Sequence, residues 1–309
     1  MSACPLCGGP GRPAFEKGGH VHAACQACGS WFVDPVPPAE ALAAFYQRAA
    51  EEAGSRLCWE GSSAHAHALW DRALEAVRRR GGGPLLDVGC GAGQFLAHAR
   101  RRGFQDLAGV EPSPAAAAAA RLASGAVVHE LELSATPPRP GGHAAVTLWD
   151  VLEHLPAPRA ARGRARALLR PGGLLGVATP NRRGLSALAF GARALVVSPP
   201  EHLLVATRRG LAAALQAEGL RLLRLESLEL RLREWTGGGG EAAAGPAAAS
   251  GGAARDRYRG AYDRLTGWGG FGLLHAAGNA VLSAARLGDQ LLAIAERPAG
   301  PGDGPPGPG

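Results

Sequence analysis

The sequence predicts an α/β fold in which a doubly wound, Rossmann-like parallel sheet follows a small N-terminal ribbon of cysteine pairs. Three observations lead to this prediction. Short apolar runs alternate with helical segments over residues 84–178, a glycine-rich turn closes the first of these runs, and two CxxC pairs stand near the N-terminus. With 309 residues, of which 46% are hydrophobic, the chain can bury a substantial core, and a disordered protein is excluded.

The first expected element is a zinc ribbon over residues 1–33, which holds two CxxC knuckles separated by residues 8–24. Each knuckle turns two thiolates toward one side of a tight turn, and two knuckles complete a tetrahedral site for Zn²⁺. Four thiolates leave no open coordination position, so the predicted zinc is structural. His20 and His22 are then not needed as ligands, and we expect them to face solvent. The predicted ligands are Cys4, Cys7, Cys25 and Cys28.

Residues 34–83 are expected to form a helical cap and linker. Pro37 and Pro38 interrupt the chain after the ribbon, and apolar residues then recur at helical spacing in two stretches. We interpret Tyr46 as a core aromatic residue, with a position lining the substrate pocket as the alternative. The apolar positions are Leu42, Phe45, Tyr46 and Ala49 in the first stretch, and Leu69, Ala73 and Val77 in the second.

Five parallel strands are expected next, because each apolar run is short and leads into a helical segment. The carboxyl ends of parallel strands meet at one edge of a sheet, and ligands of such folds bind there. A glycine turn at residues 89–93, Glu111 and Asp150 all fall at this edge. The expected strands span residues 84–89, 106–111, 126–130, 144–149 and 173–178.

The glycine turn lets a ligand approach bare backbone, because glycine has no Cβ. Gly89, Gly91 and Gly93 follow GxGxG rather than the GxGxxG that brings a helix N-terminus onto a pyrophosphate. A dinucleotide is therefore not the favoured ligand. The alternative is a tight strand-to-helix turn without any ligand. We interpret Cys90, inside the turn, as a packing residue rather than a nucleophile.

With Asp87 two residues before the first glycine, this segment resembles the first motif of class I S-adenosylmethionine-dependent methyltransferases. In that family the loop holds the amino-acid end of the cofactor, and the acid that ends the second strand accepts hydrogen bonds from both ribose hydroxyls. Glu111 matches that acid. The resemblance therefore implies S-adenosylmethionine as the cofactor. The implied cofactor-binding residues are Asp87, Gly89, Cys90, Gly91, Gly93, Glu111 and Asp150.

The resemblance continues in residues 146–155 and 168–177, which match the family's fourth strand and the turn into its fifth strand. Further strands expected over residues 220–232 and 288–295 would add the antiparallel hairpin that completes a seven-stranded methyltransferase sheet. The resemblance thus extends beyond the glycine turn and runs in order over about a hundred residues.

These elements define the expected domains. A methyltransferase domain spans residues 84–297 after the ribbon and the helical cap. Residues 236–254 inside it are rich in glycine and alanine, which is typical of a mobile insertion, and residues 298–309 are expected to form a disordered tail.

Asp150, Glu153 and His154 are spaced three and four residues apart, which would place them on one face of a helix beginning there. Histidine is a suitable general base near neutral pH. Three roles stay open here: a base that takes a proton from the acceptor, ligands of a divalent cation, or residues that hold the cofactor and its loop.

Glu201 and His202 are the second candidate for chemistry. A neighbouring carboxylate can orient a histidine or balance its charge. The pair resembles the Glu-His segment after the fifth strand of sugar-modifying methyltransferases that also carry an N-terminal zinc ribbon, where the dyad acts as base. Those proteins have aromatic residues after the dyad, whereas this chain continues with residues 203–205, Leu-Leu-Val. The alternative is a structural histidine.

Charge and hydropathy give little support for a nucleic-acid partner or a membrane span. The net charge of +7 is carried mostly by arginine, and we attribute it to GC-rich coding as much as to polyanion binding. The N-terminus lacks a basic stretch followed by an apolar run, so no secretory signal is predicted and a cytoplasmic location is expected. The apolar residues 271–287 include His275, Asn279 and Arg286, which favours a packed or interfacial helix over a membrane span.

Three hypotheses follow. The first is a methyltransferase acting on a small molecule such as a nucleotide sugar, a glycan or a secondary metabolite, with His154 or His202 assisting deprotonation. The second is an RNA methyltransferase whose ribbon grips nucleic acid. Because Arg12 and Lys17 are the only basic side chains between the knuckles, we do not expect this partner. The third is a cofactor-binding scaffold whose ribbon recruits a protein.

Overall fold

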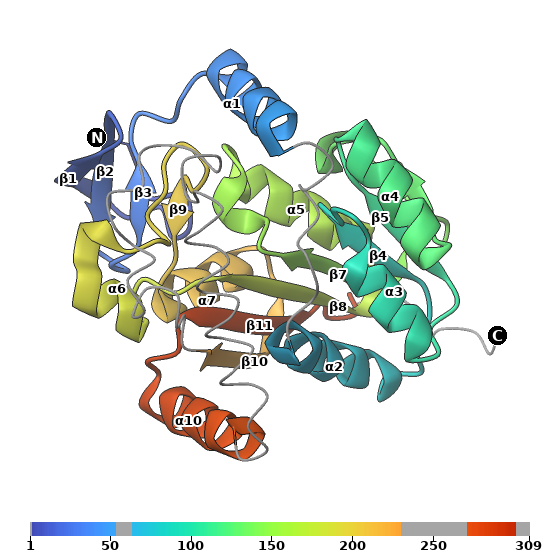
Figure 1. The fold of residues 1–309 in the computed structure, drawn as a ribbon. Coiled ribbons are helices and arrows are strands. Elements are labelled where there is room, and N and C mark those ends of the chain that lie inside the picture. Colours follow the sequence, from blue (N-terminus) through green and yellow to red (C-terminus); the bar gives the residue numbers. More distant parts are fainter. Residues whose placement is uncertain (1, 54–63, 230–270, 301–309) are drawn as a thin grey trace.

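A seven-stranded sheet forms the centre of the computed structural model, which describes residues 2–53, 64–229 and 271–300 (Figure 1). Its strand order is β10-β11-β8-β7-β4-β5-β6, and all seven expected strands are present. The strands are β4 (Leu85–Val88), β5 (Leu107–Val110), β6 (Val127–His129), β7 (His143–Trp149), β8 (Leu169–Pro180), β10 (Arg221–Leu228) and β11 (Gln290–Glu296).

Five of these strands are parallel, and β11 runs antiparallel between β8 and β10. The predicted doubly wound sheet with a closing hairpin is therefore confirmed. Strand β8 begins earlier than predicted because of an irregular start beside β7. His143 pairs with Leu169, whereas Ala145 pairs with Leu174, so that the intervening residues of β8 form a bulge.

Helices cover both faces of the sheet (Figure 1). Alternate strand residues point to opposite faces, so Leu85 packs with α2, α3 and α4 while Leu86 packs with α5 and α7. Helix α10 contacts β10, and α1 follows the ribbon. The helices are α1 (Ala39–Ala53), α2 (Ala64–Arg78), α3 (Gln94–Arg101), α4 (Pro114–Ser124), α5 (Pro158–Leu168), α6 (Leu185–Phe190), α7 (Arg208–Ala217) and α10 (Phe271–Ala285).

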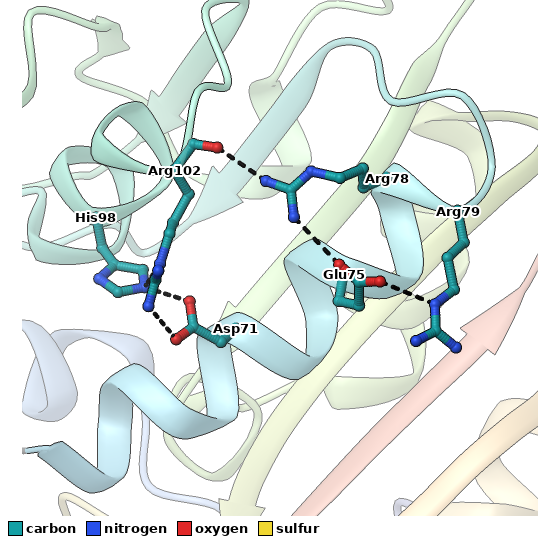
Figure 2. Close-up of polar contacts among 6 residues, drawn as sticks. All are labelled: Asp71, Glu75, Arg78, Arg79, His98 and Arg102. Atoms are coloured by element: carbon teal, nitrogen blue, oxygen red, sulfur yellow. Dashed lines mark hydrogen bonds and ion pairs between the residues drawn. The ribbon is translucent and has the colours of Figure 1, made fainter.

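Polar side chains join α2 to α3 (Figure 2). The Asp71 carboxylate on α2 lies 2.7 Å from His98 Nε2 and 2.5 Å from a terminal guanidinium nitrogen of Arg102. His98 is buried, so this carboxylate satisfies a polar group that water does not reach. One turn along the helix, Glu75 pairs only with Arg78 and Arg79 of its own segment among the six side chains drawn.

The N-terminal ribbon is a second, four-stranded sheet. Its strands are β1 (Gly11–Lys17), β2 (His20–Cys25), β3 (Trp31–Val33) and β9 (Leu204–Val205). The fourth strand was not predicted, because a two-residue apolar run between Glu201-His202 and α7 carries no periodic signal. Through β9 the ribbon is built partly from a distant segment, and Cys4, Leu6 and Phe32 share one apolar core with α5 and α7.

One expectation for the ribbon is wrong. His22 does not face solvent: it is 1% exposed, and its ring stacks on Phe15 with the ring centroids 4.6 Å apart. Burial lowers the pKa of His22 to about 4, so the ring is neutral at physiological pH. His20 is partly buried. Strand alternation explains the error, because the face of β2 that carries His22 packs against Phe15 of β1.

Several predictions concern residues outside the described ranges. The expected insertion at residues 236–254 and most of the expected tail at 298–309 lie outside them. The predicted helix in residues 271–287 is confirmed as α10. Within the described ranges, no helix combines the length and the apolar character needed to cross a membrane.

Candidate functional site

The glycine turn after β4 has one position that is open to a ligand. All three glycines have positive φ, as a tight strand-to-helix turn requires. A Cβ on Gly89 would lie 2.8 Å from Val151, and a Cβ on Gly93 would lie 2.8 Å from the backbone of Ala120. A Cβ on Gly91 would meet nothing within 4 Å. Gly91 is therefore where bare backbone faces open space, while the other two glycines allow close packing.

Glu111 reaches this open position from the end of β5. One of its carboxylate oxygens accepts a hydrogen bond from the Gly91 N–H at 3.0 Å, and the other accepts one from the Ser113 N–H at 3.0 Å. The carboxylate thus lies at the loop, where it can meet two hydroxyl groups of a ligand. Gly91 and Glu111, which follow different strands, are thus joined directly by a hydrogen bond.

Asp87 and Cys90 lie beneath the loop. Asp87 is 2% exposed and accepts a hydrogen bond from the Thr147 hydroxyl at 2.6 Å. Burial, followed by the nearby Glu111 charge, raises the pKa of Asp87 to about 8. The Cys90 sulfur would lie 2.7 Å from a Cβ on Gly109, and burial raises the pKa of its thiol. A buried, protonated thiol is a poor nucleophile, in agreement with a packing role.

Asp150 does not share a helical face with Glu153 and His154. The three-residue 3₁₀ helix η3 (Leu152–His154) is too short to align them, and Asp150 has φ +52. Its carboxylate accepts a hydrogen bond from the Gln290 side chain at 2.7 Å, whereas the buried Glu153 accepts one from Thr179 at 3.0 Å. The i, i+3, i+4 spacing failed as a guide because the segment after β7 is a turn.

His154 and His202 come together instead. Their ring centroids lie 4.8 Å apart in an edge-to-face arrangement. Nδ1 of His154 lies 2.8 Å from the Glu201 carbonyl oxygen, and Nδ1 of His202 lies 2.9 Å from the Val196 carbonyl oxygen. Carbonyls only accept hydrogen bonds, so both rings carry a proton on Nδ1 when neutral and have their lone pair on Nε2. In this tautomer Nε2 is the ring nitrogen that can accept a proton.

The Glu201 side chain is not the group that orients His202. Its carboxylate lies 3.4 Å from the Ser198 hydroxyl, while its backbone carbonyl serves His154. The two members of the predicted dyad thus act on different partners. One ligand atom from each of Glu153, His154 and His202 lies within 4.8 Å of the others, a set that can also hold a cation.

Tyr46 joins this cluster from α1. Its hydroxyl lies 3.3 Å from Nδ1 of His154 and 3.4 Å from the Glu201 carbonyl. Desolvation around the phenol, and then the charges of Glu201 and Glu153, raise its pKa. Tyr46 is 40% exposed, so the interpretation as a core aromatic residue is wrong. Its hydroxyl lies at the histidine cluster instead.

The histidine cluster and the glycine turn lie at the same edge of the sheet. Val151, whose side chain would collide with a Cβ on Gly89, stands just before η3. Strands β4 and β7, which lead into the two segments, are paired in parallel with Val88 opposite Leu148. Both segments therefore leave the same edge of the sheet, as the sequence predicted.

The four ribbon cysteines converge at the base of the N-terminal sheet. The Sγ atoms of Cys4 and Cys28 are 3.8 Å apart, those of Cys7 and Cys25 are 3.5 Å apart, and all four lie within 4.8 Å of one another. Sulfurs at the corners of a tetrahedron around zinc are separated by about 3.8 Å, since each Zn–S bond is about 2.3 Å. The donor set and its spacing fit Zn²⁺, and the separations are too long for disulfides.

A family model described as "Methyltransferase domain" matches residues 62–225, slightly more than half of the chain. The ubiquinone biosynthesis O-methyltransferase of Xanthomonas campestris pv. campestris strain B100 is 33% identical over 138 residues, which cover 40% of this chain and 55% of that protein. The protein of the same name from Pseudomonas paraeruginosa is 34% identical over 107 residues, covering 33% and 46%. The chain thus spans about half the length of the curated relatives it matches.

Solved structures share the fold. The [4+2]-cyclase SpnF aligns with a TM-score of 0.52 at 23% identity, covering 78% of this chain and 86% of that one. The N-methyltransferase NodS of Bradyrhizobium japonicum, in complex with S-adenosyl-L-homocysteine, aligns with a TM-score of 0.50 at 14% identity, covering 82% and 99%. Because one of these proteins is named a cyclase, the fold by itself does not identify the reaction.

Proposed function

This chain belongs to the methyltransferase-domain family, and from that premise we propose that it transfers the methyl group of S-adenosylmethionine to a hydroxyl of a small-molecule acceptor. The observation that carries the proposal is the meeting of the open Gly91–Glu111 corner and the His154–His202 pair at one edge of the sheet. The first feature suits the cofactor, and the second supplies a base. The name of the curated relatives supports oxygen as the acceptor atom.

Gly91 and Glu111 are proposed to hold the cofactor. The open face of Gly91 admits its amino-acid end, and the Glu111 carboxylate exchanges its two backbone hydrogen bonds for the ribose hydroxyls. Gly89 and Gly93 let the turn pack closely against Val151 and Ala120, while the side chains of Asp87 and Cys90 are buried beneath it. Asp150 follows β7 at the same edge of the sheet. When bound, S-adenosylmethionine supplies an electrophilic methyl group. What this chain must add is alignment of the acceptor and removal of its proton.

His202 is proposed as the base. Its Nδ1–H is held by the Val196 carbonyl, so Nε2 is the ring atom that would accept the acceptor's hydroxyl proton. Bound S-adenosylmethionine would supply the methyl group to that oxygen, and its C–S bond would break to leave S-adenosylhomocysteine. His154 stands edge-on beside it, oriented by the Glu201 carbonyl, and positions the acceptor. Tyr46 closes the cluster from α1. We propose Zn²⁺ for the four-cysteine site, where it would serve structure alone.

The RNA methyltransferase and scaffold hypotheses predict different properties for the ribbon and the site. Lys17, one of two basic side chains between the knuckles, has its ammonium 3.2 Å from the Ala194 carbonyl, so it is engaged within the protein. This contact favours a small-molecule acceptor over RNA. A cofactor-binding scaffold would contain the same loop but would be indifferent to the identity of residue 202.

The test is a mass-shift screen. The zinc-loaded chain is incubated with S-adenosylmethionine and with small molecules that carry phenol, catechol or sugar hydroxyls, and products heavier by one methyl group are identified. We expect His202→Gln to lower kcat for the hit by about a hundredfold, while His20→Gln in the ribbon leaves it unchanged. Turnover only on RNA, or equal rates for wild type and His202→Gln, would contradict the proposal.

A further inference from the structure

The ribbon is hydrogen-bonded to the strand that begins beside His202. Strand β3 pairs with β9, with Phe32 opposite Leu204. Leu203, the residue after His202, is held on both sides: its carbonyl accepts from the Val33 N–H at 2.9 Å, and its N–H donates to the Glu153 carbonyl at 2.8 Å. One residue thus ties the ribbon to the backbone of the histidine cluster.

A second connection starts at a cysteine knuckle. The Thr207 hydroxyl donates to the Cys28 carbonyl at 2.7 Å and accepts from the Gly210 N–H at 3.0 Å, which caps α7. The Thr207 N–H donates to the Ser30 hydroxyl at 3.0 Å. All these partners are buried, so water does not replace the bonds when they break.

The first turn of α7 also packs directly against the cysteine cluster. A Cβ on Gly210 would lie 3.1 Å from Sγ of Cys28 and 2.5 Å from the Ser30 hydroxyl. The knuckle therefore must keep its shape for α7 to begin where it does. Strand β9 lies between this fixed helix start and His202, so both ends of the segment are set by ribbon contacts.

We infer that Thr207 is a positioning residue through which the closed four-cysteine cluster sets the place of His202. The Cys28–Thr207 and Val33–Leu203 bonds hold the segment from His202 to α7, and opening the cluster releases both. The consequence for catalysis rests on the proposed function of His202. The mechanical coupling itself does not, because it concerns only the contacts between ribbon and β9.

The full-length, zinc-loaded protein is compared as wild type, Thr207→Val and Thr207→Ser. Valine keeps the shape but loses the hydroxyl, and serine keeps the hydroxyl. We expect Thr207→Val to retain zinc and to raise amide hydrogen exchange at Val33 and Leu203 by about tenfold. The kcat should fall by about tenfold with the KM for S-adenosylmethionine unchanged, because the cofactor corner is untouched. In Thr207→Ser, which keeps the hydroxyl, the amide exchange rates and kcat should equal those of the wild type.

Removal of zinc from the wild type with a chelator should raise exchange at the same two amides. The inference would be overturned if the Val33 and Leu203 amides of Thr207→Val exchanged at the same rate as in the zinc-loaded wild type. The same rate in the metal-free wild type would also overturn it. So would an equal loss of kcat in the valine and serine variants. If the wild-type protein transfers no methyl group to any acceptor, the proposed function fails, whereas the exchange comparison still decides whether the ribbon controls β9.

Discussion

The rings of His154 and His202 lie 4.8 Å apart although one follows β7 and the other precedes β9. The hydrogen bond from the Leu203 N–H to the Glu153 carbonyl aligns the two backbones, and each Nδ1 faces a different carbonyl. The pair is therefore set by main-chain geometry rather than by the Glu201 carboxylate. Consequently, Glu201→Gln should change kcat by less than about twofold, and steady-state kinetics against wild type tests this.

Gly91→Ala should weaken binding of S-adenosylmethionine by at least about tenfold, since a methyl group fills the only open position of the turn. Gly141→Ala is the matched control. Gly141 also has positive φ and open space around it, but it lies far along the chain in the turn before β7. Both variants carry similar backbone strain, so equal affinities in calorimetry would show that Gly91 does not face the cofactor.

Glu111→Ala should also weaken the binding of S-adenosylmethionine, by about tenfold to a hundredfold, because two charge-assisted hydrogen bonds to the cofactor are lost. Asp106→Ala, which removes an exposed ion pair with Arg139 just before the start of β5, at the opposite edge of the sheet, is the control and should leave affinity unchanged. Thermal unfolding of both variants verifies that they are folded. Undiminished binding by a folded Glu111→Ala protein would remove this residue from the site.

The sheet and its glycine turn were predictable because short strands, helices and turns carry local signals. Leu85 and Leu86 face opposite layers as strand periodicity demands, and Gly91 and Glu111 meet because parallel strands end at one edge. The pairing of β3 with β9 was not predictable, since a two-residue strand has no period of its own.

The contacts within the histidine cluster could not be predicted from the sequence either. Tyr46 sits in a helical pattern, and the pattern does not say that its hydroxyl reaches His154 across the fold. Asp150 was grouped with Glu153 because a helix was assumed after β7, whereas the positive φ of Asp150 turns the chain. Such contacts depend on tertiary packing, which local periodicity does not encode.

Asp71→Asn should destabilise the protein by about 1–2 kcal/mol, because it weakens a bridge between helices and leaves the buried His98 with a poorer partner. Glu75→Gln is the control visible beside it in Figure 2. Glu75 pairs there with Arg78 and Arg79 of its own segment and its side chain is 46% exposed, so its loss should matter less. Urea unfolding compares the two, and a Glu75→Gln effect as large as that of Asp71→Asn would contradict this ranking.

Stability should fall in mild acid. Burial, with a smaller effect from Arg139, lowers the pKa of His143 to about 4, whereas an unfolded histidine has a pKa of about 6.5. Between these values only the unfolded chain binds the proton, so stability is complete above about pH 6.5 and is lost as the pH falls toward 4, by up to about 3 kcal/mol.

His143→Leu should remove this part of the acid dependence while keeping an apolar side chain at the start of β7. Urea unfolding near pH 7 and near pH 5 measures it, and His143 is suited to the test because it lies outside the ribbon. Identical pH dependence in wild type and His143→Leu would contradict the assignment.

Calorimetry of the zinc-loaded protein with S-adenosylmethionine, S-adenosylhomocysteine and NAD tests the central claim most directly. The GxGxG turn with its open Gly91 and the Glu111 carboxylate predicts saturable binding of both sulfur compounds at one site and no measurable binding of NAD. Binding of NAD in preference to S-adenosylmethionine would contradict the account at its foundation.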